Sequence, residues 1–312
     1  MPIAVHPGLA LTGAKVRDAV TNAQAQFDAS VALHERFKTP VVMSAMDLSV
    51  EADAFGCEIN LPENEVPTVL SKLVTSPEQG RVLPIPKPGD KRTGVYLETV
   101  SRLCKMPARP TVLAGCIGPF SLASRLVGMS EACSLTITDP DWMHLMLDKA
   151  AQFLSAYAQA FKGVGADGIL MAEPGAGLLS PKSLAEFSSP YIRRIVSAVV
   201  DGRFELILHN CAAKLVHLPA TIESGAKILH FGAPMDLPAA LAKVPNDVIL
   251  CGNLDPTRVF LHSKPDEVIV ETQALAKATQ GFRNYVISSG CDVPPGTPLA
   301  NLEAFFSTAV AK

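Results

Sequence analysis

The chain has 312 residues, of which 48% are hydrophobic and 6% aromatic, and its 27 basic and 30 acidic residues give a net charge of −3. The lack of a basic stripe and the few aromatic side chains argue against nucleic-acid binding. No apolar run approaches the roughly 20 residues of a membrane span. The N-terminus also lacks the basic and apolar regions of a signal peptide. We therefore predict a soluble, cytoplasmic protein.

The cysteines predict a protein with reduced thiols. Their number is odd and they are scattered through a large chain, whereas a secreted disulfide framework uses an even number of cysteines in a short chain. Free thiols are therefore expected at all seven positions, which are Cys57, Cys104, Cys116, Cys133, Cys211, Cys251 and Cys291.

Short apolar runs alternate with longer amphipathic runs along the chain. This alternation is typical of buried parallel strands that are joined by crossover helices. Eight candidate strands predict an α/β fold, a closed (β/α)8 or TIM barrel formed by residues 1–312 as a single domain. The strands are expected at Ile3–His6, Val41–Met46, Thr111–Ile117, Gly168–Ala172, Glu205–His209, Ile228–Phe231, Val248–Gly252 and Tyr285–Ser289.

The segments between these strands predict helices and one long loop. Residues 75–93 are crowded with proline and glycine, which indicates a loop excursion over the mouth or side of the barrel. Asp139 is expected to cap a helix that has Pro140 at its first position. Helices are expected at Asp139–Val164, Pro181–Val200, Leu215–Ser224, Leu237–Lys243, Pro265–Thr279 and Pro298–Val310.

Polar side chains follow many of the strands. In a barrel of this type, the residues that do chemistry lie at the carboxyl ends of the strands and on the loops that follow them. We therefore expect these side chains to meet on one face. They are Asp47, Glu51, Cys116, Glu173, His209, Cys211, His230, Asn253, Asp255, Cys291 and Asp292.

Three of these residues form a candidate metal site. In an extended segment residues i and i+2 project to the same side, so His209 and Cys211 can reach one ion. Cys291 would join them from another strand end. One imidazole and two thiolates suit zinc and leave a fourth position, where a bound thiol would lose its proton near neutral pH. The alternative is that His209 is a hydrogen-bonded core histidine and that the two cysteines are small buried residues.

Six blocks of the sequence resemble the uroporphyrinogen decarboxylase superfamily, and within it the methylcobalamin:thiol methyltransferases of the coenzyme M type. The blocks occur in the same order and extend over nearly the full length. They are MSAMDLSVEADAFGCEI (43–59), AGCIGPFSLASRLVG (114–128), GADGILMAEPGAGLLSPKSLAEFSSPYIRRI (165–195), LILHNCAAK (206–214), ILCGNLDPTRVF (249–260) and SSGCDVPPGTPLANLEAF (288–305).

This resemblance implies a (β/α)8 barrel with a cleft at the carboxyl ends of its strands. In the methyltransferase branch, a histidine, a cysteine two residues later and a distant cysteine hold zinc, and His209, Cys211 and Cys291 match these positions. The resemblance therefore implies Zn2+, a corrinoid such as methylcobalamin on a partner protein as methyl donor, and a thiol as acceptor. Ala212 departs from this branch, whose members commonly have glycine after the cysteine.

The decarboxylase branch differs near the N-terminus, where an arginine-rich segment holds the acid groups of a tetrapyrrole. In this chain Arg17 is the only arginine before Arg36, which counts against decarboxylation. Asp47 matches an aspartate that gathers the pyrrole NH groups in decarboxylases. In a methyltransferase, Asp47 would instead face the corrinoid or the acceptor.

Other cleft residues are assigned by their positions. Glu173 is expected to orient the acceptor or to be a labile fourth zinc ligand, or else to cap the next helix. His230 is expected to contact the acceptor or to support a zinc ligand, or else to be a hydrogen-bonded strand-end histidine. Gly115 and Gly118 would let the backbone approach a flat cofactor. Asn253 is grouped with these cofactor-binding residues, although its place before Asp-Pro favours a loop-fixing role.

The main hypothesis is therefore a zinc-dependent methyltransferase. It would move a methyl group from a methylated corrinoid protein to a thiol or similarly activated small-molecule acceptor. Coenzyme M, another alkylthiol, homocysteine and a folate all stay open as the acceptor. The alternatives are a metal-free uroporphyrinogen decarboxylase that depends on Asp47, and a non-catalytic corrinoid- or tetrapyrrole-binding protein.

Overall fold

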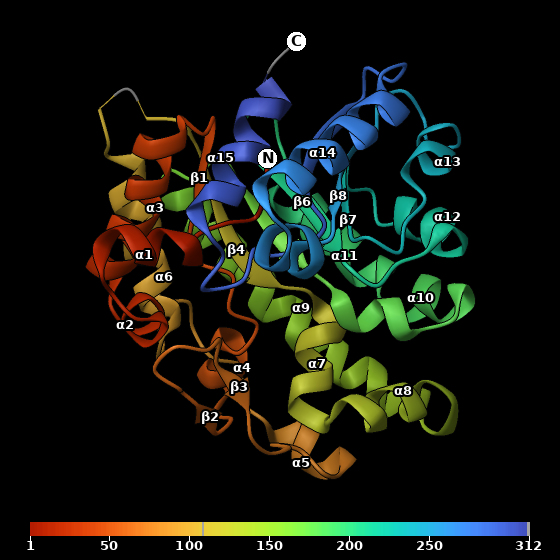
Figure 1. The fold of residues 1–312 in the computed structure, drawn as a ribbon. Helices are drawn as coiled ribbons and strands as arrows, with labels where there is room; N and C mark the ends of the chain where they lie inside the picture. Colours follow the sequence, from red (N-terminus) through yellow and green to blue (C-terminus); the bar gives the residue numbers. More distant parts are fainter. Residues whose placement is uncertain (108, 311–312) are drawn as a thin grey trace.

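A computed structural model describes residues 1–107 and 109–310. Its centre is a curled sheet of seven parallel strands, with helices around it (Figure 1). The strands follow one another around the sheet in chain order, as repeated strand–helix units require. They are β1 (Val41–Met43), β4 (Thr111–Ile117), β5 (Gly168–Ala172), β6 (Glu205–Asn210), β7 (Ile228–Phe231), β8 (Ile249–Leu254) and β9 (Tyr285–Ser289).

The first expected strand, Ile3–His6, is not formed in the structure. Ile3 makes one isolated parallel bridge to Asp292, and the chain then turns into a short 3-10 helix. Pro2 and Pro7 have no amide hydrogen to donate to a strand ladder, which limits the pairing of this segment. The prediction of a closed eight-stranded barrel is corrected accordingly: in the described part of the chain, seven strands form the sheet and the N-terminal segment is bonded beside β9.

The sequence did not predict two short strands that follow α4 (Val50–Phe55). β2 (Ile59–Asn60) and β3 (Thr68–Val69) pair antiparallel in a separate sheet. The expected loop at residues 75–93 contains a helix, α5 (Pro77–Val82), and the side chain of its N-cap residue Ser76 accepts a hydrogen bond from the Gln79 amide. Part of this segment is therefore helical despite its proline content.

The helices begin where the sequence supplies caps. As predicted, α9 begins at Pro140, and the Asp139 side chain accepts a hydrogen bond of 3.1 Å from the Trp142 amide. The α-helices are α1 (Leu9–Thr12), α2 (Val16–Thr21), α3 (Ala23–Phe37), α4 (Val50–Phe55), α5 (Pro77–Val82), α6 (Thr93–Cys104), α7 (Pro119–Val127), α8 (Met129–Thr138), α9 (Pro140–Gly163), α10 (Pro181–Phe187), α11 (Ser189–Val199), α12 (Leu218–Ile222), α13 (Leu237–Leu241), α14 (Pro265–Thr279) and α15 (Leu299–Val310). Short helices of other types are η1 (His6–Gly8), η2 (Pro174–Leu178), η3 (Leu215–His217) and η4 (Pro256–His262).

One expected helix is divided in two. The segment Pro181–Val200 breaks at Ser188 into α10 and α11. Pro190 has no amide hydrogen and cannot extend the hydrogen-bond ladder of α10, so a new helix begins there. The periodicity of the sequence predicted the helical content of this segment but not the break.

The core lies between the sheet and the surrounding helices. Every residue of β5 is buried, as is all of β4 except its first residue, as expected for strands that are covered on both faces. Within the described residues, no helix is long and apolar enough to cross a membrane.

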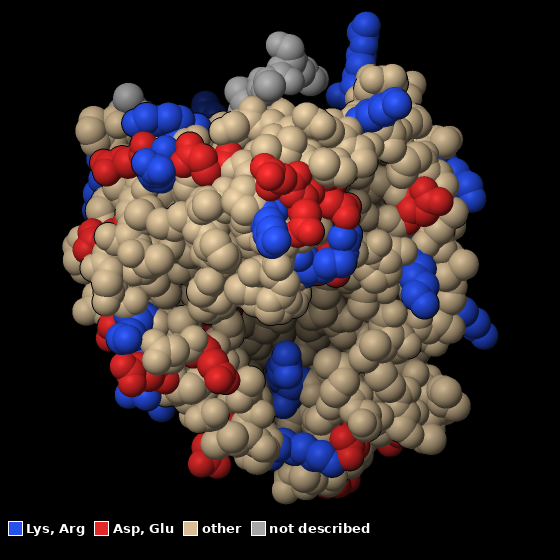
Figure 2. All heavy atoms as spheres, in the orientation of Figure 1, with Lys and Arg blue, Asp and Glu red and all other residues tan. Residues whose placement is uncertain are grey.

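The face drawn in Figure 2 shows acidic and basic side chains mixed over the surface and a hollow below its centre. The hollow lies near α4 and α7 of Figure 1. Because α4 follows β1 and α7 follows β4, this hollow opens at the carboxyl ends of the strands. A basic side chain lies in it.

Candidate metal centre

Three side chains from two strand ends meet in one cluster. His209 lies in β6, Cys211 directly follows this strand, and Cys291 comes two residues after β9. One ligand atom of each residue lies within 4.8 Å of the other two. β6 and β9 are separated in the sheet by β7 and β8, so the curl of the sheet brings their ends together. The structure thus groups the three residues that the sequence singled out as metal ligands.

Only one of the two nitrogens of the His209 imidazole is hydrogen-bonded within the described residues. Its Nδ1 lies 2.9 Å from Nδ1 of His230 and 3.3 Å from the His230 carbonyl oxygen. Its Nε2 is buried and has no hydrogen-bond partner among the described residues. Because a buried polar atom without a partner is costly, Nε2 is the nitrogen of His209 that is available to bind a cation.

The two sulfurs influence each other's protonation. Hydrogen bonding from Cys291 lowers the pKa of the Cys211 thiol, burial opposes this effect, and His209 adds to it. The same pairing raises the pKa of Cys291 far above its ordinary value. The pair alone therefore keeps one proton between the two sulfurs, and a divalent cation in its place would allow both to be thiolates.

His230 lies in β7, directly opposite His209 in the register of the sheet. Its side chain has no exposed surface and bonds to His209 and, through Nε2 at 2.9 Å, to Ser288 Oγ. Burial, followed by the charge of His209, lowers the pKa of His230 well below its ordinary value. A neutral imidazole in this position can hydrogen-bond to Nδ1 of His209 and hold the orientation of its ring.

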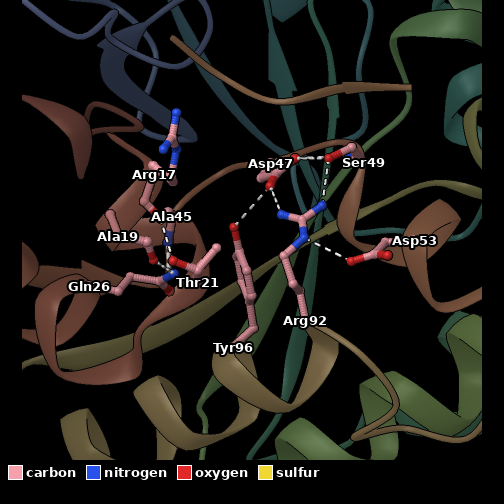
Figure 3. A network of polar contacts seen from close by, with 10 residues as sticks. All are labelled: Arg17, Ala19, Thr21, Gln26, Ala45, Asp47, Ser49, Asp53, Arg92 and Tyr96. Atoms are coloured by element: carbon pink, nitrogen blue, oxygen red, sulfur yellow. Dashed lines mark hydrogen bonds and ion pairs between the residues drawn. The ribbon is translucent and has the colours of Figure 1, made fainter. Parts of the chain in front are cut away.

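Asp47 belongs to a network of polar contacts that occupies both of its oxygens (Figure 3). Oδ2 pairs with the Arg92 guanidinium, and Oδ1 accepts hydrogen bonds from the Ser49 amide (2.9 Å) and hydroxyl (2.6 Å). Arg92 also contacts Asp53, with 2.8 Å between Nε and Oδ2. Since Arg92 is the N-cap residue of α6, the network fastens the end of the long loop to the residues that follow β1.

Glu173 follows β5 and is directed toward α7. Its Oε1 accepts a hydrogen bond of 2.9 Å from the Ser121 amide, and its Oε2 is buried against Gly118 without a hydrogen-bond partner in the described residues. Burial raises the pKa of Glu173 to about 8, so its carboxyl group is mostly protonated at neutral pH. In this conformation Glu173 is not part of the ligand cluster around His209.

Gly118→Ala should destabilise the protein by about 1–3 kcal/mol. A Cβ atom at this position would lie 1.5 Å from Oε2 and 2.5 Å from Cδ of Glu173, so the buried carboxyl group would have to move. Urea denaturation measures the loss. Gly163→Ala is the matched control, because a Cβ there meets nothing within 4 Å. Equal losses in the two variants would contradict the expected clash.

Glu51 is a second buried carboxyl group at the carboxyl ends of the strands. It lies in α4, and its Oε1 accepts a hydrogen bond of 3.0 Å from the Ile117 amide. Its Oε2 is buried without a partner in the described part of the chain. Burial raises the pKa of Glu51 to about 8. The folded protein therefore favours the protonated form of this residue.

Glu51→Gln should weaken the pH dependence of stability. The pKa of Glu51 rises from 4.5 to about 8 on folding, so its stabilising effect is complete below pH 4.5 and is lost as the pH rises toward 8. The total loss is on the order of a few kcal/mol. Glutamine stays neutral, so urea midpoints of the variant should fall less over this range than those of the wild type. Glu303→Gln, at an exposed position, should follow the wild type; a Glu51→Gln curve parallel to the wild type would speak against this explanation.

Gly115 and Asn253, two of the residues expected near a cofactor, make contacts within the fold. Gly115 is buried in β4 and its amide donates to Ser44 Oγ at 2.8 Å. Asn253 donates from Nδ2 to the carbonyl oxygens of Gly232 (3.0 Å) and Met235 (2.7 Å). These bonds tie β8 to the loop after β7, which matches the loop-fixing role expected of Asn253.

Sequence reasoning missed two residues that the structure places at these sites. Arg92 is 45 residues from Asp47, and nothing in its local sequence indicates that pairing. Ser288 is 58 residues from His230. Its one signal in the sequence is its place at the start of SSGCDVPPGTPLANLEAF (288–305), three residues before Cys291.

Comparisons with known proteins extend these observations. The sequence matches the uroporphyrinogen decarboxylase (URO-D) family over residues 8–311. It is 27% identical to the methylcobamide:CoM methyltransferase MtbA of Methanosarcina acetivorans over 302 residues, and this alignment covers 96% of this chain and 87% of that protein. It is also 27% identical over 294 residues to a uroporphyrinogen decarboxylase of Pseudomonas syringae, covering 90% of this chain and 82% of that protein.

A solved structure, described as a methyltransferase from Methanosarcina mazei, superposes with a TM-score of 0.87 at 25% sequence identity. The superposition covers 99% of this chain and 91% of that one. The match to the family and the similarity to this structure thus both extend over nearly the whole chain. This chain therefore belongs to the uroporphyrinogen decarboxylase family, and its relatives in that family include both methyltransferases and decarboxylases.

Proposed function

We propose that this protein is a zinc-dependent methyltransferase that moves a methyl group from a methylated corrinoid protein to a thiol or similarly activated acceptor. The observation that carries the proposal is the cluster of His209, Cys211 and Cys291, whose ligand atoms lie within 4.8 Å of one another. Two of the related proteins, from M. acetivorans and M. mazei, are methyltransferases by name, which supports the same reading.

The three residues fit Zn2+. Nitrogen and sulfur ligands around a tetrahedral zinc ion stand about 3.5–4 Å apart. Ligand atoms that already lie within 4.8 Å of one another need only a small closing movement. Nε2 of His209, which has no hydrogen-bond partner in the described part of the chain, would supply the nitrogen. Three protein ligands leave a fourth position for an acceptor, as in catalytic rather than structural zinc sites.

Zinc bound here would supply Lewis acidity, which lowers the pKa of an acceptor thiol so that its thiolate is available near neutral pH. In the overall reaction a sulfur–carbon bond forms, the cobalt–carbon bond of the corrinoid breaks, and its electron pair stays on cobalt. The chain holds the imidazole and the two cysteine sulfurs at the carboxyl ends of β6 and β9. The acceptor and the corrinoid would approach from that side of the sheet.

The remaining candidate residues take supporting roles in this proposal. Glu173, whose pKa of about 8 keeps it protonated at neutral pH, would have to turn its Oε2 away from Gly118 before it could orient the acceptor by donating a hydrogen bond. Gly115, Gly118 and Asn253 would shape the backbone where a flat corrinoid has to approach. Asp47 would meet a ligand only after its pairing with Arg92 opens.

Decarboxylation is the second candidate, because the family and the relative from P. syringae carry that name. In decarboxylases the matching aspartate gathers the pyrrole NH groups of the substrate. Here both oxygens of Asp47 are already engaged by Arg92 and Ser49. This arrangement favours methyl transfer over decarboxylation.

Two assays separate these functions. The purified protein is incubated with methylcobalamin and a panel of thiols, and separately with uroporphyrinogen, each with and without a metal chelator. We expect formation of methylated thiol that the chelator abolishes and added zinc restores, and no release of carbon dioxide. Carbon dioxide release that resists the chelator would identify a decarboxylase instead. Corrinoid binding without either product would identify a binding protein.

A further inference from the structure

A buried chain of hydrogen bonds leads away from the metal side of His209. His230 Nδ1 lies 2.9 Å from His209 Nδ1, and His230 Nε2 lies 2.9 Å from Ser288 Oγ. Ser288 Oγ in turn bonds to the carbonyl oxygen of Met1. The three side chains are each 2% exposed or less. The chain of bonds thus runs from β6 through β7 to β9 and ends on the backbone of the N-terminal segment.

The last acceptor in this series of hydrogen bonds determines where each proton lies. The Met1 carbonyl oxygen can only accept, so Ser288 donates its single hydroxyl proton to it. Ser288 Oγ must then accept a hydrogen bond from Nε2–H of His230. The partners of His230 are an imidazole and a hydroxyl, and complete burial keeps such a ring neutral, with one proton.

The same reasoning fixes the proton of the candidate ligand. With its proton on Nε2, His230 has a lone pair on Nδ1, which accepts a hydrogen bond from Nδ1–H of His209. The lone pair of His209 is then on Nε2, which is the buried atom that has no partner in the described residues. A lone pair on that atom is what a metal ion needs.

We propose that His230 and Ser288 are positioning residues that fix the His209 tautomer in which Nε2 is the metal-binding atom. Metal-ligating histidines commonly donate their second N–H to an acceptor that orients the ring. Here that acceptor is another imidazole, whose own tautomer is set by a serine and a backbone carbonyl. The two rings meet edge to face, with centroids 4.8 Å apart and an interplanar angle of 76°, so neither ring can turn without losing the bond between them.

Nitrogen-15 NMR of histidine-labelled, metal-free protein tests the tautomers directly. We expect the proton on Nδ1 of His209 and on Nε2 of His230. A proton on Nε2 of His209 in the wild-type protein would overturn the proposal. The protein in this experiment contains no zinc, so the tautomers are tested independently of the proposed function. The catalytic role of these tautomers, by contrast, rests on the proposed function.

Ser288→Ala tests the consequence for metal binding. The variant removes the acceptor of the His230 Nε2–H, so His209 should populate both tautomers, and zinc affinity measured by chelator competition should fall about 10–100-fold. Ser288→Thr, which keeps the hydroxyl group, should restore most of the affinity. A thermal unfolding curve for each variant confirms that it is folded before its affinity is compared.

Ser289→Ala is the matched control for this comparison. Ser289 lies on the same strand as Ser288 and is equally buried. It accepts a hydrogen bond of 3.0 Å from the Ile3 amide of the same N-terminal segment, but it is not part of the series of hydrogen bonds that includes His230 and His209. We expect wild-type tautomers and zinc affinity in this variant. Equal weakening in the two alanine variants, with unchanged His209 tautomers, would overturn the proposal. A wild-type protein that binds no zinc would instead refute the proposed function, and the NMR result alone would then decide the tautomer.

Discussion

Cys291→Ala should lose its bound zinc and nearly all methyl transfer. The substitution removes one of two sulfur ligands and leaves His209 and Cys211 as a two-ligand site, which holds zinc too weakly to survive dialysis. We expect zinc content to fall from near stoichiometric to background, and the rate of methyl transfer from methylcobalamin to thiols to fall about a thousandfold or more. Elemental analysis and the transfer assay on the same preparation measure the two effects.

Two further cysteine variants make this test specific. Cys211→Ala should behave like Cys291→Ala. Cys133→Ala removes another partly buried thiol, on α8, and should keep both zinc and activity. Full zinc content in both ligand variants would refute the metal centre. Loss of zinc with wild-type transfer rates would refute the role of zinc in the reaction.

Arg92→Met should destabilise the folded protein by about 3–5 kcal/mol. The side chain of Asp47 has no exposed surface and that of Arg92 is 9% exposed, so the substitution leaves a buried carboxylate without its counter-charge. The Arg92 hydrogen bonds to Asp53 and Ser49 are lost as well. Urea denaturation at neutral pH measures the change in the free energy of unfolding.

The cost should depend on the unpaired charge rather than on the loss of arginine itself. The double variant Arg92→Met with Asp47→Asn removes both charges and should recover much of the lost stability. Arg36→Met breaks an exposed pair with Glu303, whose side chains are 57% and 52% exposed, and should cost about 0–1 kcal/mol. If Arg92→Met cost as little as Arg36→Met, the buried network would contribute nothing measurable.

The candidate metal ligands were predictable because their signal is local. His209 and Cys211 are two residues apart in an extended segment, and the period of a strand places both side chains on one side. Cys291 was proposed as the third ligand because it follows another strand, and the resemblance supported that choice. Its meeting with the other two depends on the curl of the sheet between β6 and β9. The alternation of short apolar runs with longer amphipathic runs predicted seven of the strands within a few residues. The eighth, at Ile3–His6, forms only one bridge, since pairing depends on backbone donors that Pro2 and Pro7 lack.

The sequence by itself therefore determined the order of strands and helices and the type of ligand set, since both follow from hydrophobic periodicity and from the chemistry of residues near one another in the chain. Tertiary structure alone decided which partner each buried polar group has. Arg92 occupies Asp47 from 45 residues away, and Ser288 reaches His230 across 58 residues. The sequence pattern of a strand predicts the side to which a side chain points. The group that this side chain contacts, however, comes from another strand or loop. That group then sets the charge or tautomer of the residue in the site.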